Sequence, residues 1–284
     1  MTENLSIAIA QLNPTVGDIL GNTARILKAR EKAAKLGANI VVCGELTLSG
    51  YPSEDLVLKR SFQNQIRDSV EQLAETTIDG GPALIIGAPW IVENNLYNAA
   101  LVLDKGKVIG VRLKHELPNY GVFDEKRVFS SGPMPGPVQV RGVRLGLMIC
   151  EDMWFPDITE CLEESGAEIL IVINGSPFET NKLEERLNYA VSRVTESHLP
   201  IVYVNLVGGQ DELVFDGASF ILGGDCSLRV RASSWKETVL VSHWQKDKNG
   251  WNCDQAKINP TFDLCQSTYQ AMVLGLRDYV TKNK

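Results

Sequence analysis

Three short apolar segments of the chain each end in a residue that could take part in acyl transfer. NIVVCGE ends in Glu45, KVIGVRLK ends in Lys114, and VRLGLMIC ends in Cys150. Because a helical pattern opens at Pro156, we expect a strand-to-helix corner at Cys150. Such a corner places the sulfur near backbone N–H groups and the positive end of a helix, which predicts a lowered thiol pKa. A carboxylate base, a cation and a thiol nucleophile together suit acyl transfer.

Composition limits the class of protein. The 284 residues are 44% hydrophobic and 22% charged, as in an ordinary globular protein. A net charge of −7 disfavours a nucleic-acid surface, which needs a basic patch. The sequence contains neither an apolar run of the ~20 residues needed to span a bilayer nor a recognisable secretory signal. We therefore expect a cytoplasmic protein that binds neither nucleic acid nor membrane.

Metal, redox and phosphate-loop sites are disfavoured by the spacing of the relevant residues. The six cysteines are widely spread and contain no CxxC pair, which argues against a zinc site, a redox dithiol or a disulfide framework. The three histidines are too scattered to bind a metal. The segment GGQDE at 208–212 lacks the Walker spacing and is interpreted as a tight glycine turn lining the site.

The elements that position these residues alternate between strands and helices. Apolar strands are predicted at 5–12, 39–45, 83–90, 143–150, 168–174 and 200–209, with a hairpin over 97–114 that turns at 104–107. Helical faces are indicated by Ile26, Ala29, Ala33 and Leu36, by Phe62, Ile66, Val70 and Leu73, and by Leu183, Leu187, Val191 and Val194. This alternation predicts an α/β fold, and the absence of a Pro/Gly/Ser-rich linker favours a single domain.

The stretches around the three residues resemble those of the nitrilase, or carbon–nitrogen hydrolase, superfamily. They are GELTLSGYPSEDL around Glu45, RLKHELPNYGVFDEKRVF around Lys114 and MICEDMWFPD around Cys150, and they follow the family's order. The resemblance implies a four-layer α-β-β-α sandwich and a Glu–Lys–Cys triad, with each member at the end of a strand. It also implies that no metal is needed.

Three further segments, ELPNYGVFDEKR, NGSPFE and VNLVGGQDELVFDGAS, are similar to the glutaminase domain of glutamine-dependent NAD synthetases. This implies a hydrolase (glutaminase) domain at 1–260, and at 261–284 a helix that leads to an ATP-dependent synthetase domain. The SGGxDS loop of that domain is not in this sequence. ATP and Mg²⁺ would belong to the synthetase half, and the glutaminase half would need no cofactor. The implied partners are L-glutamine, a synthetase domain or subunit, and further copies of the chain in a homo-oligomer.

The same resemblance implies a role for each matching residue. Cys150 would attack the side-chain amide of glutamine and form a thioester, Glu45 would transfer protons, and Lys114 would stabilise the oxyanion together with the backbone N–H of Glu151. The other matching positions are Glu125, which would orient the lysine; Tyr120 and Phe123, as walls of the glutamine pocket; and Glu151, Ser176 and Arg186, which would hold the amino and carboxylate ends of glutamine.

Other interpretations of these residues remain open. Taken singly, Cys150 could be a core residue, Glu45 a solvated carboxylate, and Lys114 a surface cation. Arg186 lies in KLEERLN, where surface ion pairs are common. Two alternative functions also remain: a stand-alone carbon–nitrogen hydrolase acting on another small amide, such as an ω-amidase, and a non-catalytic docking module for a synthetase.

Overall fold

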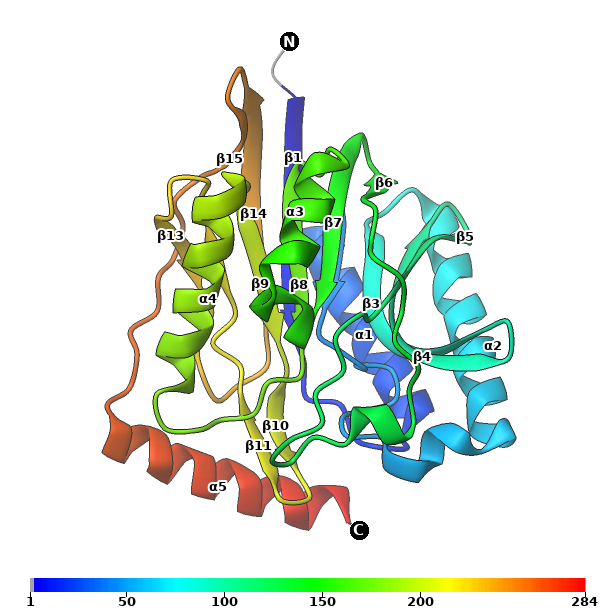
Figure 1. Ribbon diagram of the computed structural model, residues 1–284. Helices are drawn as coiled ribbons and strands as arrows, with labels where there is room; N and C mark the ends of the chain where they lie inside the picture. The colour runs from blue at the N-terminus through cyan, green and yellow to red at the C-terminus, as the bar shows by residue number, and fades with distance from the viewer. Residues whose placement is uncertain (1–2, 284) are drawn as a thin grey trace.

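Two β-sheets face each other in the computed structural model, which describes residues 3–283 (Figure 1). The first sheet has seven strands in the order β15-β14-β1-β2-β3-β4-β5, and the second has six in the order β13-β12-β9-β8-β7-β6. The first sheet is formed by β1 (Glu3–Gln11), β2 (Ile40–Cys43), β3 (Ala83–Val92), β4 (Asn95–Asp104), β5 (Lys107–Leu113), β14 (Thr238–Asp247) and β15 (Gly250–Cys253). The second is formed by β6 (Val138–Val140), β7 (Val143–Ile149), β8 (Ile169–Asn174), β9 (Ile201–Asn205), β12 (Phe220–Leu222) and β13 (Leu228–Arg231).

Helices cover the outer face of each sheet. The helices α1 (Ile19–Lys35) and α2 (Arg60–Thr76) pack on the first sheet, and α3 (Pro156–Glu164) and α4 (Lys182–Ser197) pack on the second. Alternation along β1 shows how one strand serves two layers: Ile7 and Ile9 enter the core between the sheets, whereas Ala8 and Ala10 face α1 and α2. The predicted four-layer α-β-β-α sandwich is confirmed.

Strand direction brings the candidate residues to one edge of the sandwich. Strands β1, β2 and β3 are parallel, and the antiparallel β3–β4–β5 meander returns β5 to the same direction. Strands β7, β8 and β9 are parallel in the second sheet. Glu45, Lys114 and Cys150 follow the carboxyl ends of β2, β5 and β7, and a hydrogen bond of 3.2 Å from Glu45 N–H to the Asn174 carbonyl joins the two sheets there. Ligand sites in α/β folds form at such carboxyl ends.

The predicted hairpin is confirmed, another local prediction is wrong, and a third is only partly confirmed. The predicted strand at 200–209 divides at Leu206 into β9 and β10 (Val207–Gln210), and β10 pairs with β11 (Leu213–Asp216) in a separate hairpin. In α4, Ala190 and Val194 share the buried face with Arg186 and Arg193. Of the four predicted apolar residues, Val194 is buried, and Leu187 and Val191 are half-exposed but pack against the same core. Leu183 is half-exposed. Arginines can occupy this face because backbone carbonyls accept their N–H groups.

Short 3₁₀ turns complete the connections: η1 (Glu54–Leu58), η2 (Thr77–Asp79), η3 (Glu125–Arg127) and η4 (Cys150–Trp154). The last helix, α5 (Leu264–Lys282), crosses one end of the sandwich beneath the β10–β11 hairpin (Figure 1). The boundary predicted between the hydrolase domain (1–260) and the C-terminal segment (261–284) remains a prediction. Both segments include residues outside the described range, namely Met1, Thr2 and Lys284. Within residues 3–283, no helix combines the length and apolar character needed to cross a membrane.

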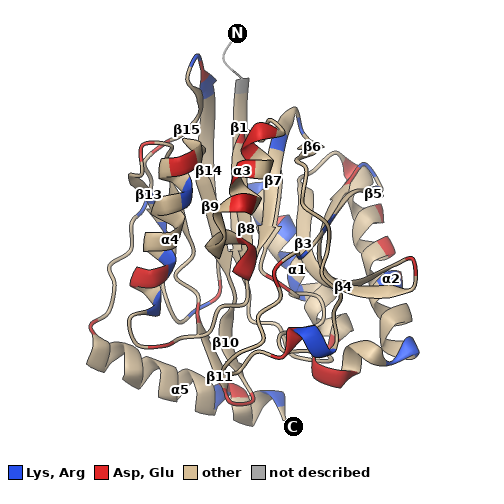
Figure 2. Cartoon of the chain, in the orientation of Figure 1, with Lys and Arg blue, Asp and Glu red and all other residues tan. Residues whose placement is uncertain are grey.

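The helix α5 carries few charged residues (Figure 2) and exposes many large apolar side chains. Its inner face buries Ala271, Leu274 and Asp278. The large apolar side chains on the exposed side are Leu264, Tyr269, Met272, Val273, Leu276, Tyr279 and Val280. An exposed stripe of this kind marks an interaction surface more often than a free one.

Candidate active site

A buried ammonium lies between two buried carboxylates. Lys114 Nζ is 2.7 Å from Glu45 Oε1 and 2.8 Å from Glu125 Oε1. Glu45 and Lys114 are fully buried, and Glu125 is 5% exposed. Burial alone lowers the pKa of Lys114, but Glu125 and Glu45 outweigh burial and hold that pKa well above its usual value. Burial raises the pKa of Glu125 to about 6, although Lys114 opposes the rise. The structure brings together these three residues, which were predicted from the sequence.

The Cys150 thiol adjoins this cluster and is itself buried, with 6% of its surface exposed. The charges of Glu45 and Lys114 both act on its pKa, which burial and then Glu45 raise well above the usual value, against the opposing effect of Lys114. The predicted lowering of the thiol pKa is therefore wrong, because desolvation exceeds any helix-end effect. A thiol held protonated needs a base to become a nucleophile, and Glu45 is the adjacent carboxylate.

The backbone at Cys150 has a left-handed conformation, with φ of 48°. A non-glycine residue in this region is strained by about 1–3 kcal/mol, and such strain concentrates at functional sites. The strained residue opens the 3₁₀ turn η4, which separates the end of β7 from α3. At this corner Cys150 belongs to the edge of the apolar core between the two sheets, and its thiol is within the electrostatic influence of Glu45 and Lys114.

Asp152 joins the turn after Cys150 to the segment after Lys114. One carboxylate oxygen accepts the N–H groups of His115 (3.0 Å) and Glu116 (2.9 Å). The other accepts Ile149 N–H at 3.0 Å and an N–H of Arg112 at 3.1 Å. Because Asp152 is fully buried, these four bonds rigidly connect the two strand ends. Asp152 was not among the predicted site residues, although its position two residues after Cys150 could have indicated a role at the site.

Two more buried residues hold the carboxylates and were also missed. Asn98 Nδ2 donates to Glu45 Oε1 at 2.7 Å, and the Tyr51 hydroxyl donates to Glu125 Oε1 at 2.9 Å. Tyr51 lies in the GELTLSGYPSEDL stretch, whereas Asn98 lies within the apolar strand YNAALVL. An asparagine in such a strand is the kind of buried polar residue that needs a specific partner.

Aromatic residues and Glu151 form the mouth of the cluster. The Tyr120 hydroxyl donates to both Glu151 carboxylate oxygens at 3.0 Å, and the rings of Tyr120 and Phe123 meet edge to face with centroids 5.6 Å apart. Tyr120 is 51% exposed, whereas Glu151 is buried. Burial raises the pKa of Glu151, while Tyr120 and Lys114 act to lower it. The geometry brings these three predicted residues together.

Ser176 and Arg186 lie together, but Arg186 has its own protein partners. Its guanidinium donates to the Ser176 hydroxyl at 3.0 Å, to the Ser176 and Pro177 carbonyls at 2.8 and 2.7 Å, and to Asp216 Oδ1 at 2.8 Å. Arg186 is 1% exposed. Protein oxygens accept four of the five guanidinium N–H groups, which favours a structural role, and the predicted role of Arg186 in holding one end of glutamine stays a prediction.

Lys182, at the start of α4, is a cation that the sequence analysis missed. Its Nζ lies 4.6 Å from the ring centroid of Trp154 and 3.2 Å from Glu185, and its charge lowers the pKa of Glu151 against the larger effect of burial. The side chain is 11% exposed. Lys182 therefore lies against Trp154 of the turn η4, which also carries Glu151, and its lone position before LEERLN gave little signal of this placement.

The predicted glycine turn at 208–212 does not line the Glu45–Lys114–Cys150 cluster; it contacts α5. Gly209 N–H donates to Asp278 Oδ2 at 2.8 Å, and the Gly209 carbonyl accepts from Lys282 Nζ at 2.8 Å. A Cβ on Gly209 would lie 2.8 Å from Gly275 Cα, so only glycine permits this close approach. Hence the turn anchors α5.

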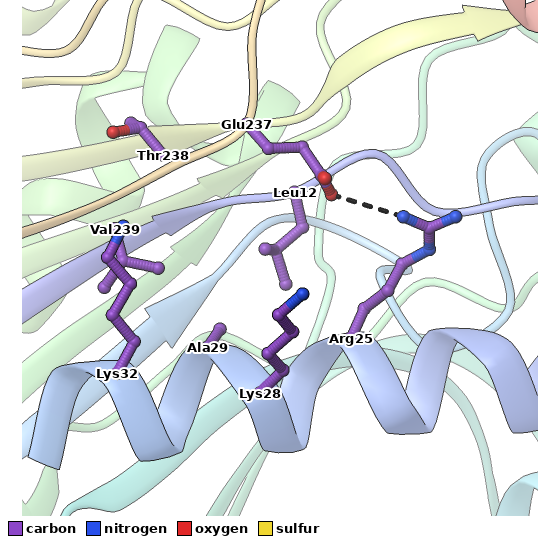
Figure 3. Close-up of a pocket in the computed structure, with 8 residues that line it drawn as sticks. All are labelled: Leu12, Arg25, Lys28, Ala29, Lys32, Glu237, Thr238 and Val239. Atoms are coloured by element: carbon purple, nitrogen blue, oxygen red, sulfur yellow. Dashed lines mark ion pairs between the residues drawn. The ribbon is translucent and has the colours of Figure 1, made fainter.

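A groove on the α1 side of the first sheet is lined by none of the cluster residues (Figure 3). It has a volume of about 250 Å³ and runs between α1 and the start of β14. Arg25, Lys28 and Lys32 line one wall, and Arg25 pairs with Glu237 at 3.5 Å. Within residues 3–283, no group of three or more His, Cys, Asp or Glu side chains is arranged to bind a metal ion.

Comparison with known proteins identifies relatives along the whole chain. The family model for carbon-nitrogen hydrolases matches residues 6–249. The chain is 43% identical to the glutamine-dependent NAD(+) synthetase of Rhodobacter capsulatus and 36% identical to that of Aquifex aeolicus, with 100% and 98% of this chain aligned. The alignments cover only 51% and 54% of those two proteins. The chain thus spans about half the length of the curated relatives it matches.

Solved structures give the same result. A glutamine-dependent NAD+ synthetase from Acinetobacter baumannii, solved with ADP, superposes with a TM-score of 0.92 at 34% identity, over 98% of this chain and 52% of that one. An amidase from Nesterenkonia superposes with a TM-score of 0.74 at 24% identity, over 84% of this chain and 92% of that one. The second likeness shows a shared fold.

The α-β-β-α sandwich and the match to the carbon-nitrogen hydrolase model over residues 6–249 define a hydrolase of carbon–nitrogen bonds. The chain belongs to the carbon–nitrogen hydrolase family. Its resemblance to the glutaminase part of glutamine-dependent NAD synthetases is also confirmed.

Proposed function

We propose that this chain hydrolyses the side-chain amide of L-glutamine and supplies ammonia for the ATP-dependent amidation of deamido-NAD by a synthetase domain or partner. The observation that carries the proposal is the Lys114 ammonium, held by Glu45 at 2.7 Å beside the buried Cys150 thiol. The similarity to glutamine-dependent NAD synthetases supports glutamine as the substrate.

In the proposed mechanism, Glu45 takes the Cys150 proton as the sulfur attacks the amide carbon of glutamine. The carbonyl oxygen becomes an oxyanion next to Lys114, whose charge acts strongly because the site is dry. Glu45 gives the proton to the departing nitrogen, so that ammonia leaves and a thioester remains. Glu45 then activates a water that hydrolyses the thioester, and the thiol and glutamate form. Glu125 holds Lys114 from the other side and keeps it charged.

The ends of glutamine would be bound by the rim of the site. Glu151 offers a buried carboxylate for the α-ammonium, with Tyr120 and Phe123 as walls. We assign the α-carboxylate to Lys182, whose ammonium acts on the same side of the site as Glu151. Lys182→Met is expected to raise KM for glutamine at least tenfold with a smaller change in kcat. An unchanged KM would remove Lys182 from the binding site.

The direct test measures ammonia and glutamate released from glutamine, with and without an added synthetase domain. Labelling of Cys150 by a glutamine-mimicking diazo-ketone serves as the second readout. Glutamine turnover with stoichiometric labelling supports the proposal. Preference for α-ketoglutaramate over glutamine would favour an ω-amidase, and a folded protein that is neither labelled nor active would favour a docking module.

The partner in this proposal contacts α5. The exposed apolar side of that helix supports such a contact, because Tyr269, Met272 and Leu276 are each more than 60% exposed. We assign ATP and Mg²⁺ to the synthetase half and no cofactor to this half. A homo-oligomer remains a prediction, which sedimentation of the purified chain would test.

A further inference from the structure

The backbone of segment 175–177 sets the direction of the Glu45 carboxylate. Oε1 of this carboxylate accepts from Lys114 and Asn98, both at 2.7 Å. Oε2 accepts from Gly175 N–H at 2.8 Å. This backbone N–H fixes the rotation of the carboxylate about its last bond, and a base must be aimed at its proton to act. Any shift of segment 175–177 therefore turns Glu45.

Arg186 holds segment 175–177 from the buried face of α4. Its Nη2 donates to the carbonyls of Ser176 and Pro177 at 2.8 and 2.7 Å, and its Nε donates to the Ser176 hydroxyl at 3.0 Å. Asn205 holds the other side, since its side chain accepts from Ser176 N–H and donates to the Ser176 carbonyl, both at 3.0 Å. The planar guanidinium makes a rigid clamp that a lysine cannot reproduce.

Asp216 connects this clamp to the β10–β11 hairpin. It is the last residue of β11, is 5% exposed, and its Oδ1 accepts from Arg186 Nη1 at 2.8 Å. It lies opposite Val207, the first residue of β10. The ion pair thus joins α4 and segment 175–177 to a hairpin that belongs to neither large sheet.

The hairpin is in turn fixed to the far end of α5. Asp278 is buried and accepts from Gly209 N–H at 2.8 Å and from Asn13 Nδ2 at 2.7 Å. Lys282 donates to the Gly209 carbonyl at 2.8 Å. Because Gly209 packs directly against Gly275, α5 cannot move without displacing the hairpin.

We propose that Arg186 and Asp216 are positioning residues for Glu45, and that they couple its carboxylate to α5 through the β10–β11 hairpin. The inference rests on the proposed function only in taking Glu45 as the base for Cys150. In this proposal Arg186 acts on the reaction by holding segment 175–177, which orients Glu45, and not by contacting the substrate. It also means that a partner bound to the exposed side of α5 could change the activity of Glu45 without touching it.

The test follows the reaction of Cys150 with iodoacetamide, measured by mass spectrometry of its peptide between pH 6 and 10. The sulfur displaces iodide from carbon, and Glu45 takes the thiol proton. Glu45→Gln provides the reference for loss of the base. Arg186→Met is expected to slow labelling at pH 7 at least tenfold, and Asp216→Asn at least threefold. In both variants the rate should rise steeply above pH 8, because hydroxide must replace the misplaced base.

Arg30 provides a matched control remote from the cluster. It is also a buried arginine on a helix, pairs with Asp79 at 2.6 Å, and donates through Nε to the Pro82 carbonyl at 2.9 Å. Arg30→Met therefore removes the same chemistry from α1. We expect a comparable loss of thermal stability but a rate and pH profile of Cys150 labelling within twofold of the wild type.

The α5 part of the proposal is tested with Asp278→Ala. As a single change, this variant is expected to slow labelling about threefold. Combined with Arg186→Met, it should cause no further slowing, because both changes interrupt the same series of contacts between α5 and Glu45. Fully additive effects would separate α5 from the clamp. A wild-type rate of Cys150 labelling in folded Arg186→Met and Asp216→Asn would overturn the positioning role. If Arg186→Met does not fold, Asp216→Asn alone still provides the test.

Glutamine turnover distinguishes this inference from the proposed function. Arg186→Met should lower kcat with KM within threefold of the wild type, the opposite of the pattern expected for Lys182→Met. If wild-type Cys150 labels in a Glu45-dependent way but glutamine is not hydrolysed, the glutaminase proposal fails and the positioning role stands. If labelling does not depend on Glu45, the positioning role fails.

Discussion

Replacing Lys114 by methionine tests the buried ion cluster of the site. It measures separately what the ammonium contributes to the free energy of unfolding and what it contributes to turnover. The side chain length is kept, but two carboxylates lose the ammonium that lies 2.7 Å from Glu45 and 2.8 Å from Glu125. Leaving buried charge without its partner costs about 3–5 kcal/mol of unfolding free energy. Loss of an oxyanion donor lowers turnover by a factor of about 10²–10³.

The sign of the pH dependence follows from the raised carboxyl pKa. Glu125 already has a pKa of about 6, raised by burial against the effect of Lys114. Without Lys114 that pKa rises further, so the folded protein binds a proton that the unfolded chain releases at lower pH. A raised folded-state pKa means that stability is lost as pH rises through it. The destabilisation of Lys114→Met should therefore be larger at pH 8 than at pH 5.5.

The double variant Lys114→Met/Glu125→Gln is the matched control. Counting Glu45, Glu125 and Lys114, the cluster has a charge of −1 in the wild type, −2 in the single variant and −1 in the double variant. Urea unfolding at pH 8 should show that the double variant recovers at least half of the lost stability. Ammonia release should remain as low as in the single variant. Turnover within tenfold of the wild type in either variant would refute the role of Lys114 as the oxyanion cation.

Further predictions concern the nucleophile, the second glutamate and the rim. Cys150→Ala should abolish ammonia release and change the unfolding free energy by less than about 2 kcal/mol, since a small side chain is removed; residual turnover near the wild-type rate would contradict the thioester. Between pH 4.5 and 6.5, wild-type stability should fall by about 1.5 kcal/mol as Glu125 ionises, and Glu125→Gln should lose this component in urea melts at several pH values. Tyr120→Phe removes the bond to Glu151 and should change KM for glutamine by about 3–10-fold with kcat nearly constant; a change confined to kcat would move Tyr120 out of the binding wall.

Much of the arrangement could be predicted from short segments. Glu45, Lys114 and Cys150 each follow an apolar run, and parallel strands in an α/β fold end at a common edge. Local pattern placed each residue at a strand end, and the resemblance to the carbon–nitrogen hydrolases indicated that the three act together. The same was true of the β4–β5 hairpin, whose turn residues lie at 104–107.

The faces and partners of the elements could not be predicted in this way. In α4, the spacing predicted an apolar buried face, but carbonyls from η4 and segment 175–177 allow Arg186 and Arg193 to be buried there as well. Sequence gives no information on those carbonyls, because they come from other parts of the chain. For the same reason Lys182 was missed, and the turn at 208–212 was assigned to the wrong surroundings.

The sequence by itself determined the order of strands and helices and which chemical groups stand at the strand ends, because periodicity and turn residues act over a few positions. Only the tertiary structure decided the protonation of Cys150, the partners of Arg186 and the anchoring of α5. Desolvation, ion pairing and close glycine contacts depend on groups far apart in the chain, and they exist only once the sheets and helices have packed.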